Sequence, residues 1–374
     1  MKKPGTPFPA TGYFGPEYFC DREKELDQLL HNIEGGHSTT LIALRRMGKT
    51  ALIRHLFHHL RSKYITIYMD ILPTETLQDM LNHLSNAIVT TYSERSSTGK
   101  RFWQMIRSMR PVISYDTLSG APLISIKSTP EESRKSMAEL FAILEELPKP
   151  VVIAIDEFQQ ILEYPEKQTD AWLRSLVQNL KNVTFIFSGS QQHLMKDLFA
   201  NPERPFFRST QFMKIGKLDE EVYRRFIIRK FRHHDISVSD ETVKEMLNWT
   251  DSHTYYVQLL CGRVFLSAGK EVIRENWQDE ARKILKEQEF VFFGYREMLT
   301  KPQWDLLRAI AREGRVYQPT SAEFITAHAL GNPATVLRSL KALVRMELVY
   351  RETDTDEPSY YGVYDILFAR WVGR

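Results

Sequence analysis

One short segment, Ala43-Leu44-Arg45-Arg46-Met47-Gly48-Lys49-Thr50, constrains the fold of this chain more than any other. It follows a β-prone run over residues 38–44 and precedes a helical apolar pattern that starts at Lys49. Such a strand-loop-helix turn points backbone N–H groups at phosphate oxygens. In the usual phosphate-loop pattern a glycine stands five residues before Gly-Lys-Thr, and here that position is Ala43. The segment predicts a phosphate-binding loop.

Three residues of this loop have a chemical role. Gly48 lets the backbone approach the phosphates, Lys49 reaches the β- and γ-phosphate oxygens, and the Thr50 hydroxyl ligates Mg²⁺. The alternative is an accidental Gly-Lys-Thr, which the strand before it and the amphipathic helix after it argue against. The sequence has no Asn-Lys-x-Asp tetrad of the kind that reads guanine, so we expect ATP rather than GTP.

A second signal is an apolar strand, residues 151–155, that ends in Asp156-Glu157. The carboxyl ends of parallel strands are where such sheets bind ligands. We therefore expect Asp156 to hold Mg²⁺ through water, and Glu157 to orient or deprotonate the attacking water. The alternative is that the two carboxylates merely cap the following helix.

A third signal is the buried-strand pattern of residues 183–187, which ends at Ser188. Ser188 is a candidate to sense the γ-phosphate by a hydrogen bond; the alternative is a simple turn after a strand. Strands alternate with helical patterns at residues 74–91, 131–147 and 170–180. This alternation predicts an α/β core in which a parallel sheet is covered on both faces.

Other segments of the first half are less regular. Asp21 is expected to cap a helix over residues 21–32, and residues 112–115 and 123–126 predict a β-hairpin. The three histidines of the helix after the phosphate loop are expected to lie on a solvated helix face: His55, His58 and His59. After about residue 215 the strands give way to helices at 219–231, 239–249 and 253–268.

Size and composition set the class of protein. A chain of 374 residues predicts two or three domains. The two cysteines have no partner at metal-ligand spacing, which favours a reducing compartment. The N-terminus has no apolar signal region, and no apolar run reaches the roughly 20 residues that span a bilayer. We expect a cytoplasmic protein with no membrane partner.

Residues 299–374 predict a winged helix-turn-helix. A first helix covers residues 299–310, and a second is capped by Thr320 or Ser321. Asn332 caps a third helix, with Pro333 at its first position. Two β runs, 348–351 and 360–364, then flank a polar tip.

This module has the geometry of a DNA-binding domain but little of the charge. The third helix would present four side chains to a major groove: Thr335, Arg338, Ser339 and Lys341. Residues 301–374 hold ten Lys and Arg against nine Asp and Glu, and the wing tip carries Asp354, Asp356 and Glu357. Phosphate neutralisation supplies much of DNA affinity. The charge balance therefore favours a protein–protein or intramolecular role over DNA binding.

In this order the signals resemble the AAA+ class of P-loop NTPases. Within it, the chain is similar to the archaeal-type ATPase family allied to the STAND signalling ATPases. That family has a Gly-Arg-Glu-like box before its first helix, here Phe19-Cys20-Asp21-Arg22-Glu23-Lys24-Glu25-Leu26, and a loop that often reads Pro-Arg-Arg-x-Gly-Lys-Thr. The resemblance implies that Asp21 and Arg22 lie near the adenine.

Two more elements of the resemblance concern the γ-phosphate and the lid. Pro205-Phe206-Phe207-Arg208 matches the family's Pro-x-x-Arg, which makes Arg208 a candidate arginine finger acting in cis or on a neighbouring subunit, with Arg204 as the alternative. His253-Thr254-Tyr255-Tyr256 resembles the start of a lid helix. His253 would sense nucleotide there, or cap the helix or join its core.

The complete prediction is an ATPase with ATP and Mg²⁺ as cofactors. It has a P-loop core at residues 1–215, a helical lid at 216–290 and a winged-helix domain at 291–374. The predicted catalytic residues are Glu157, Lys49, Arg208 and Ser188, and the predicted metal ligands are Thr50 and Asp156. The predicted ATP-binding residues are Asp21, Arg22, Arg45, Arg46, Met47, Gly48, Lys49, Thr50, Ala51 and His253. The first hypothesis for the function is an ATP-driven switch with a protein partner or self-association. The alternatives are an ATP-dependent DNA-binding regulator and an ADP-bound scaffold without turnover.

Overall fold

The architecture is taken from a computed structural model, which describes residues 4–92, 96–117, 120, 122–352 and 358–373. The chain forms two compact units. The first, here called the core unit, is Gly12–Gly216. The second, here called the carboxyl unit, is Lys217–Arg374 together with Met1–Thr11. Each unit is described by itself, and the division into three domains at residues 215 and 290 stays a prediction.

The core unit is built on a five-stranded parallel sheet in the order β2-β5-β6-β1-β7. The strands are β1 Thr39–Ala43, β2 Ile65–Asp70, β5 Val151–Asp156, β6 Val183–Gly189 and β7 Gln211–Ile215. β1, β5 and β6 are buried along their whole length, as expected for central strands covered on both faces. Because β6 lies between β1 and β5, the three sequence signals meet at one edge of the sheet.

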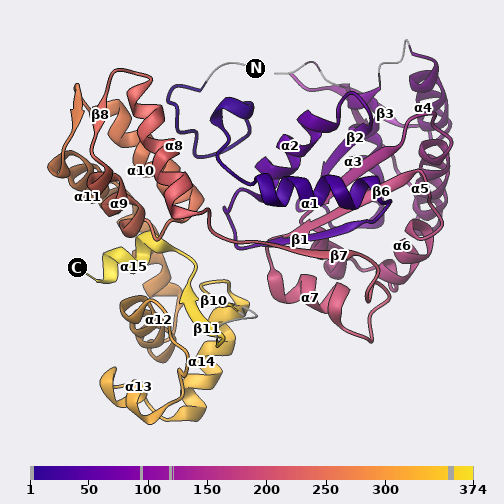
Figure 1. Cartoon of the computed structure of the whole chain (residues 1–374). Helices are drawn as coiled ribbons and strands as arrows, with labels where there is room; N and C mark the ends of the chain where they lie inside the picture. The colour runs from indigo at the N-terminus through magenta and orange to yellow at the C-terminus, as the bar shows by residue number, and fades with distance from the viewer. Residues whose placement is uncertain (1–3, 93–95, 118–119, 121, 353–357, 374) are drawn as a thin grey trace. The chain divides into compact units, whose positions relative to one another are not determined.

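Helices cover both faces of this sheet (Figure 1), and each face has its own apolar core. Against one face pack α1 Glu23–Glu34 and α2 Lys49–Leu60, through leucines and isoleucines at helical spacing. The core on the other face contains side chains of α3 Leu77–Thr91, α5 Pro130–Glu145, α7 Gln192–Ala200 and the 3-10 turn η2 Phe158–Glu163, and α4 Ser97–Ser108 joins it by packing on α3 and α5. α6 Thr169–Val177 follows η2, and a short 3-10 turn, η1 Pro16–Tyr18, precedes α1. The predicted α/β core is confirmed.

Several local predictions can be compared with these elements. β3 Val112–Tyr115 pairs antiparallel with β4 Pro122–Ser125, which confirms the hairpin. The helix predicted from residue 74 begins later, because the Thr76 hydroxyl accepts from the Asp79 N–H and a reciprocal capping box forms there. The capping role predicted for Asp21 is wrong: α1 begins at Glu23, and Asp21 has a left-handed φ of 56°.

The carboxyl unit begins with helices, as predicted: α8 Glu220–Arg232, α9 Asp240–Trp249, α10 Thr254–Ser267 and α11 Arg274–Met298. The expectation that strands stop after about residue 215 is wrong here, because two short parallel strands lie between these helices, β8 Ser237–Val238 and β9 Glu271–Val272. From the N-terminal arm, Phe8 is buried against Phe231 and Phe265. The arm therefore packs into the helical part of this unit.

The predicted winged helix follows, with α12 Lys301–Glu313, α13 Ala322–Ala327, α14 Pro333–Arg345, the antiparallel pair β10 Val349–Glu352 and β11 Tyr360–Val363, and α15 Ile366–Val372. Ser321 and Asn332 cap the second and third helices through their side chains. The predicted acidic wing tip lies outside the described residues. In the part of the chain that the structure describes, no helix is long and apolar enough to cross a bilayer.

Candidate nucleotide site

The phosphate loop joins the end of β1 to the start of α2. Gly48 stands directly before the helix with φ of 89°, a left-handed conformation that glycine adopts without steric cost. Arg46 is also left-handed, with φ of 63°. Ala43 is the buried last residue of β1 and is not among the residues with positive φ. The first position of the pattern therefore accepts alanine here because the chain is still a strand at that point.

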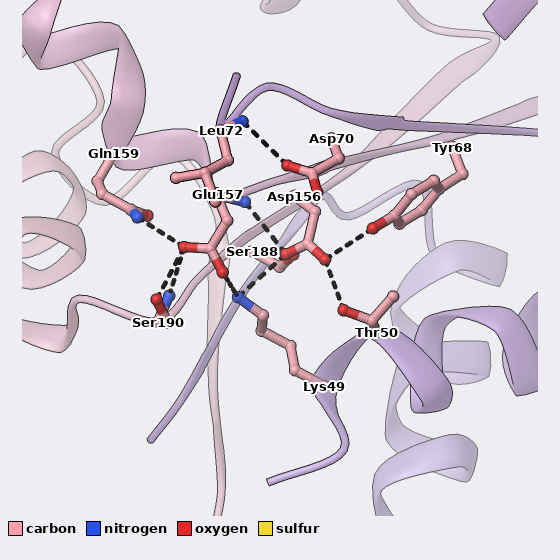
Figure 2. A network of polar contacts seen from close by, with 10 residues as sticks. All are labelled: Lys49, Thr50, Tyr68, Asp70, Leu72, Asp156, Glu157, Gln159, Ser188 and Ser190. Carbon is pink, nitrogen blue, oxygen red and sulfur yellow. Dashed lines mark hydrogen bonds and ion pairs between the residues drawn. The ribbon is translucent and has the colours of Figure 1, made fainter. Parts of the chain in front are cut away.

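Lys49 lies between the two carboxylates that end β5 (Figure 2). Its Nζ is 3.0 Å from Asp156 Oδ1 and 3.0 Å from Glu157 Oε1. Thr50 Oγ1 donates to Asp156 Oδ2 at 2.7 Å. Lys49 and Asp156 are almost completely buried. The structure thus brings together the four residues that the sequence assigned to phosphate, metal and water.

Asp156 accepts more hydrogen bonds than any sequence signal indicated. In addition to Lys49 and Thr50, the hydroxyls of Tyr68 and Ser188 donate to it, at 2.9 and 2.5 Å. Burial raises the pKa of Asp156, but Lys49 and the hydroxyl donors outweigh burial and lower that pKa to about 2. The carboxylate is therefore ionised and fixed in orientation at neutral pH.

Glu157 is held by a separate set of donors. Gln159 Nε2 and Ser190 Oγ donate to its Oε2, at 2.7 and 2.8 Å, while Lys49 contacts Oε1. Its backbone is left-handed, with φ of 55°, which turns the chain sharply after Asp156. Burial raises the pKa of Glu157, and Lys49 and Gln159 lower it by more, so the net direction is downward.

Sequence reasoning missed Tyr68, Gln159 and Ser190. A tyrosine in a buried strand looks like a core residue, and only its position two residues before Asp70 at the strand end marks it as near the site. Ser190 directly follows β6, so the strand end that marked Ser188 could also have marked Ser190. Gly189 beside it leaves space for Gln159: a Cβ there would meet the Gln159 side-chain oxygen and lie 2.6 Å from Met195.

Ser188 lies where predicted, at the end of β6, and is completely buried. Its hydroxyl donates to Asp156 in this structure, so a role toward the γ-phosphate stays a prediction. Arg45 and Arg46 are exposed in the loop, and Met47 is buried beneath it. Ala51 lies in the first turn of α2.

The two candidate arginine fingers lie away from this network. Arg204 pairs with Asp197 at 2.5 Å and Asp170 at 3.7 Å. Arg208 precedes β7, which starts opposite the amino end of β1 in the parallel register. The five residues of β7 span about 17 Å at about 3.3 Å each, so Arg208 lies toward the sheet edge opposite the phosphate loop. The structure does not bring Arg208 to Lys49 within one chain.

The remaining candidates are distributed over both units. Arg22 lies beside the phosphate loop, where its Nη2 donates to Met47 O at 3.4 Å. Asp21 precedes it in the chain. His253 belongs to the carboxyl unit, where it is the buried residue before α10 and its ring lies 4.9 Å from that of Tyr256.

On the third helix of the winged helix, the four DNA candidates differ in exposure. Arg338 and Lys341 are exposed and Thr335 is half-buried. Ser339 is only 6 % exposed. The prediction that Ser339 presents its side chain to DNA is wrong, because Ser339 lies on the same face as Val336, Leu340 and Leu343, which packs into the domain.

Comparison with known proteins agrees with this geometry. The family described as "ATPase domain predominantly from Archaea" matches residues 19–260. A second family, described as "Probable winged helix domain", matches residues 290–374. A search of curated protein sequences gave no significant match.

Three of the solved structures of similar fold are archaeal proteins. The Walker-type ATPase PABY2304 of Pyrococcus abyssi superposes with a TM-score of 0.69 at 20 % identity, over 98 % of this chain and 99 % of that one. The ORC2 protein of Aeropyrum pernix, in ADPNP–ADP complexes, gives 0.59 at 11 % identity over 94 % and 92 %. The ORC1 protein of the same organism, in complex with DNA, gives 0.50 at 12 % identity over 96 % and 94 %.

At these sequence identities the superpositions show only that the folds are similar. The family match covers more than half of the chain and includes the phosphate loop, the Asp156-Glu157 strand end and the strand of Ser188. The chain therefore carries an ATPase-type domain followed by a winged-helix domain, and it belongs to the family of ATPases found predominantly in Archaea.

Proposed function

We propose that this protein binds ATP with Mg²⁺ and hydrolyses it to ADP and phosphate, and that this cycle controls its lid and winged helix. The observation that carries the proposal is the position of Lys49 Nζ, 3.0 Å from both Asp156 and Glu157 at the mouth of the phosphate loop. A cation, a hydroxyl and two carboxylates meet where backbone N–H groups of a helix start are available. This set matches the needs of phosphoryl transfer.

Thr50 and Asp156 fit a Mg²⁺ ion. Their oxygens are 2.7 Å apart, and a hydroxyl with a carboxylate is the oxygen pair that Mg²⁺ takes beside nucleotide phosphates. When bound, the ion would neutralise charge on the phosphate oxygens. Tyr68 and Ser188 keep the Asp156 carboxylate oriented toward that position.

The resting contacts indicate how Glu157 becomes a base. A bound triphosphate attracts Lys49, which then leaves Glu157 Oε1, while Gln159 and Ser190 continue to hold Oε2. Losing the nearby cation raises the pKa of Glu157 and makes it a better proton acceptor. The water oxygen forms a bond to the γ-phosphorus, and the bond between the γ-phosphorus and the β–γ bridging oxygen breaks. Glu157 accepts the water proton, and ADP leaves with the bridging oxygen.

Arg208 would complete such a site only from a second copy of the chain. Its position toward the opposite sheet edge leaves the neighbouring subunit, of the two alternatives, as the one we propose. In the same scheme, ATP is contacted by the other predicted residues: Asp21, Arg22, Arg45, Arg46, Met47, Gly48, Ala51 and His253. Self-association would then accompany turnover.

The switch acts through residues 216–290 as lid and 291–374 as winged helix. ATP binding draws them against the core, and hydrolysis releases them. A DNA-binding regulator is the second candidate, supported by the exposed Arg338 and Lys341 and by the likeness of the fold to an ORC1 protein solved with DNA. DNA retention that falls steeply with salt would favour that candidate.

Equilibrium binding tests the nucleotide part of the proposal. Titration calorimetry with ATP is run in Mg²⁺ and in EDTA on the wild type, Lys49→Ala, Thr50→Val and the exposed control Thr90→Val. We expect Lys49→Ala to weaken binding at least about tenfold, because a charged hydrogen bond contributes about 1.5–3 kcal/mol. Thr50→Val should remove the gain from Mg²⁺, and Thr90→Val should change nothing. Equal ATP affinity in the wild type and Lys49→Ala would refute the assignment.

A further inference from the structure

The chain passes between its two units twice, once between Thr11 and Gly12 and once between Gly216 and Lys217. Any change in the relation of the units must involve these two passages. On the core side, Tyr13 near the first passage is bonded to the helix that follows the phosphate loop, and Gly216 at the second passage is bonded to Arg22, which also contacts the loop.

At the second passage, the guanidinium of Arg22 joins two distant carbonyl groups. Its Nη2 donates to Gly216 O at 2.7 Å and to Met47 O at 3.4 Å. Gly216 is the last residue of the core unit, and Met47 directly precedes Gly48 of the phosphate loop. One nitrogen atom therefore contacts both the loop and the exit of the chain.

The setting of Arg22 makes this bridge rigid. The residue is only 5 % exposed, and its Nη1 pairs with Glu25 Oε1 at 2.6 Å. Its φ of 77° turns the chain so that α1 starts at the next residue. Hydrogen bonds from a charged group are short and strong, and a buried cation without acceptors is costly. The bond to Gly216, at 2.7 Å, is of this kind, whereas the contact with Met47, at 3.4 Å, is long. A shift of the Met47 carbonyl would shorten or break that contact and so change the acceptors around the guanidinium.

At the first passage, His55 of α2 makes the attachment that Arg22 makes at the second. The Tyr13 hydroxyl lies 2.9 Å from His55 Nδ1, and the Phe19 ring stacks on the imidazole with centroids 4.1 Å apart. His55 was expected on a solvated face, and it is instead partly buried by these two rings. The segment that has just entered the core unit is thus attached to the helix that begins at Lys49.

We infer that Arg22 is a positioning residue that couples occupancy of the phosphate loop to the chain passage at Gly216. His55 gives the first passage a similar attachment to α2. The inference rests on the proposed function, because it takes nucleotide phosphates as the ligand that shifts the loop. Coupling of this kind requires that the ligand favours one arrangement of the bridge over another. Arg22 supplies the shared contact through which that preference reaches Gly216.

Trypsin cleavage at Lys217 tests the coupling, because Lys217 is exposed directly after the passage. The rate of cleavage between Lys217 and Leu218 is measured by mass spectrometry on the full chain, with and without a non-hydrolysable ATP analogue and Mg²⁺. Each variant is used at nucleotide saturation, fixed from its own binding curve. In the wild type we expect the analogue to change this rate by at least about fivefold, the lower end of usual coupling energies. In Arg22→Gln the ratio of the two rates should fall to near one.

Two control variants separate coupling from general stability. Lys63→Gln removes an exposed charge outside the bridge, and Arg101→Gln removes an exposed ion pair with Glu146. Both should keep the wild-type ratio of rates. If Arg22→Gln does not fold, Arg22→Lys takes its place, since lysine keeps the charge but cannot present the same fork of N–H donors.

The outcomes are distinct. A wild type that binds no nucleotide refutes the proposed function, and with it the ligand that the coupling needs. A wild type that binds nucleotide but shows no change at Lys217 refutes the coupling alone. An Arg22→Gln or Arg22→Lys variant that binds nucleotide and keeps the wild-type ratio also refutes it. Loss of the ratio in the Arg22 variant, with both controls unchanged, supports it.

Discussion

Replacing Lys49 by methionine should destabilise the nucleotide-free core unit, because two buried carboxylates lose the cation between them. Lys49 Nζ lies 3.0 Å from both Asp156 and Glu157, and the side chains of the three residues are 7, 3 and 17 % exposed. Methionine keeps most of the unbranched side chain and removes the ammonium group with its charge and its N–H donors. The variant therefore measures what the ammonium group of Lys49 contributes through its ion pairs and hydrogen bonds.

The size of the effect follows from the same contacts. Lowering the pKa of Asp156 from 3.8 to about 2 corresponds to about 2 kcal/mol of free energy of unfolding at neutral pH. Glu157, whose pKa is also lowered, adds to this. Removing one partner from a buried ion pair usually costs about 3–5 kcal/mol. We expect a loss in that range for Lys49→Met at pH 7.

The loss should shrink as the pH falls. In the wild type both carboxyl pKa values are lowered in the folded state, so their stabilisation is complete above about pH 5 and is lost toward pH 2. In Lys49→Met, the two buried like charges raise the pKa of at least one carboxyl above its unfolded value. That group takes up a proton in the folded state as the pH falls, which restores stability. The difference between the two proteins is therefore larger at pH 7 than at pH 5.

Hydrogen exchange followed by mass spectrometry measures this loss of stability in the core unit alone. The slowest amides of β5 and β6 report its global opening. An increase in their exchange rate of about two to four orders of magnitude at pH 7 corresponds to the expected loss. The exposed Lys63→Met is the control, with an expected change within about 0.5 kcal/mol. Equal protection in the wild type and Lys49→Met, or a difference that grows as the pH falls, would refute this account of the resting site.

Three further predictions concern single positions. Asp21→Gly should raise the free energy of unfolding by about 1 kcal/mol in denaturant titrations, since glycine adopts φ of 56° without the cost that other residues incur; a destabilised variant would show that the Asp21 side chain is needed. Gly189→Ala should lower it by about 1–3 kcal/mol and slow ATP turnover, because the new Cβ would collide with Gln159 and Met195; wild-type stability would contradict the tight packing. Burial, with some help from neighbouring histidines, lowers the pKa of His55 to about 4, so the wild type should lose stability as the pH falls from about 6.5 to 4. The melting temperature of His55→Phe should fall less over that interval, and equal slopes would exclude His55 as the cause.

The sequence was most informative where one pattern served both fold and chemistry. Val151 to Ile155 is apolar because the strand is buried on both faces, and its end must then carry Asp156 and Glu157 at the sheet edge. The phosphate loop was equally clear, because strand, glycine turn and helix are all local. The order of the strands, which places Ser188 beside Asp156, requires pairings far apart in the chain and followed only from the structure.

Contacts made by ordinary-looking residues could not be predicted. A tyrosine in a strand and a glutamine in a turn are ordinary residues at such places. The hydrogen bonds of Tyr68 to Asp156 and of Gln159 to Glu157 depend on the tertiary structure. Arg22 was recognised only by resemblance, and its bond to Gly216 joins residues 194 positions apart. The helix cap predicted at Asp21 is wrong although aspartate is a common capping residue. The Asp21 backbone is left-handed, and the helix begins two residues later, at Glu23.

ATP turnover by the purified full-length chain with Mg²⁺ tests the central claim most directly, measured beside Glu157→Gln and Lys49→Ala over a range of protein concentrations. The account predicts turnover in the wild type, and a loss of at least about 100-fold in Glu157→Gln with ATP still bound, because a positioned general base contributes about 10²–10⁴. Lys49→Ala should lose both turnover and ATP affinity. Wild-type turnover that persists in Glu157→Gln, or a wild type that binds ATP and never hydrolyses it at any concentration, would contradict the claim.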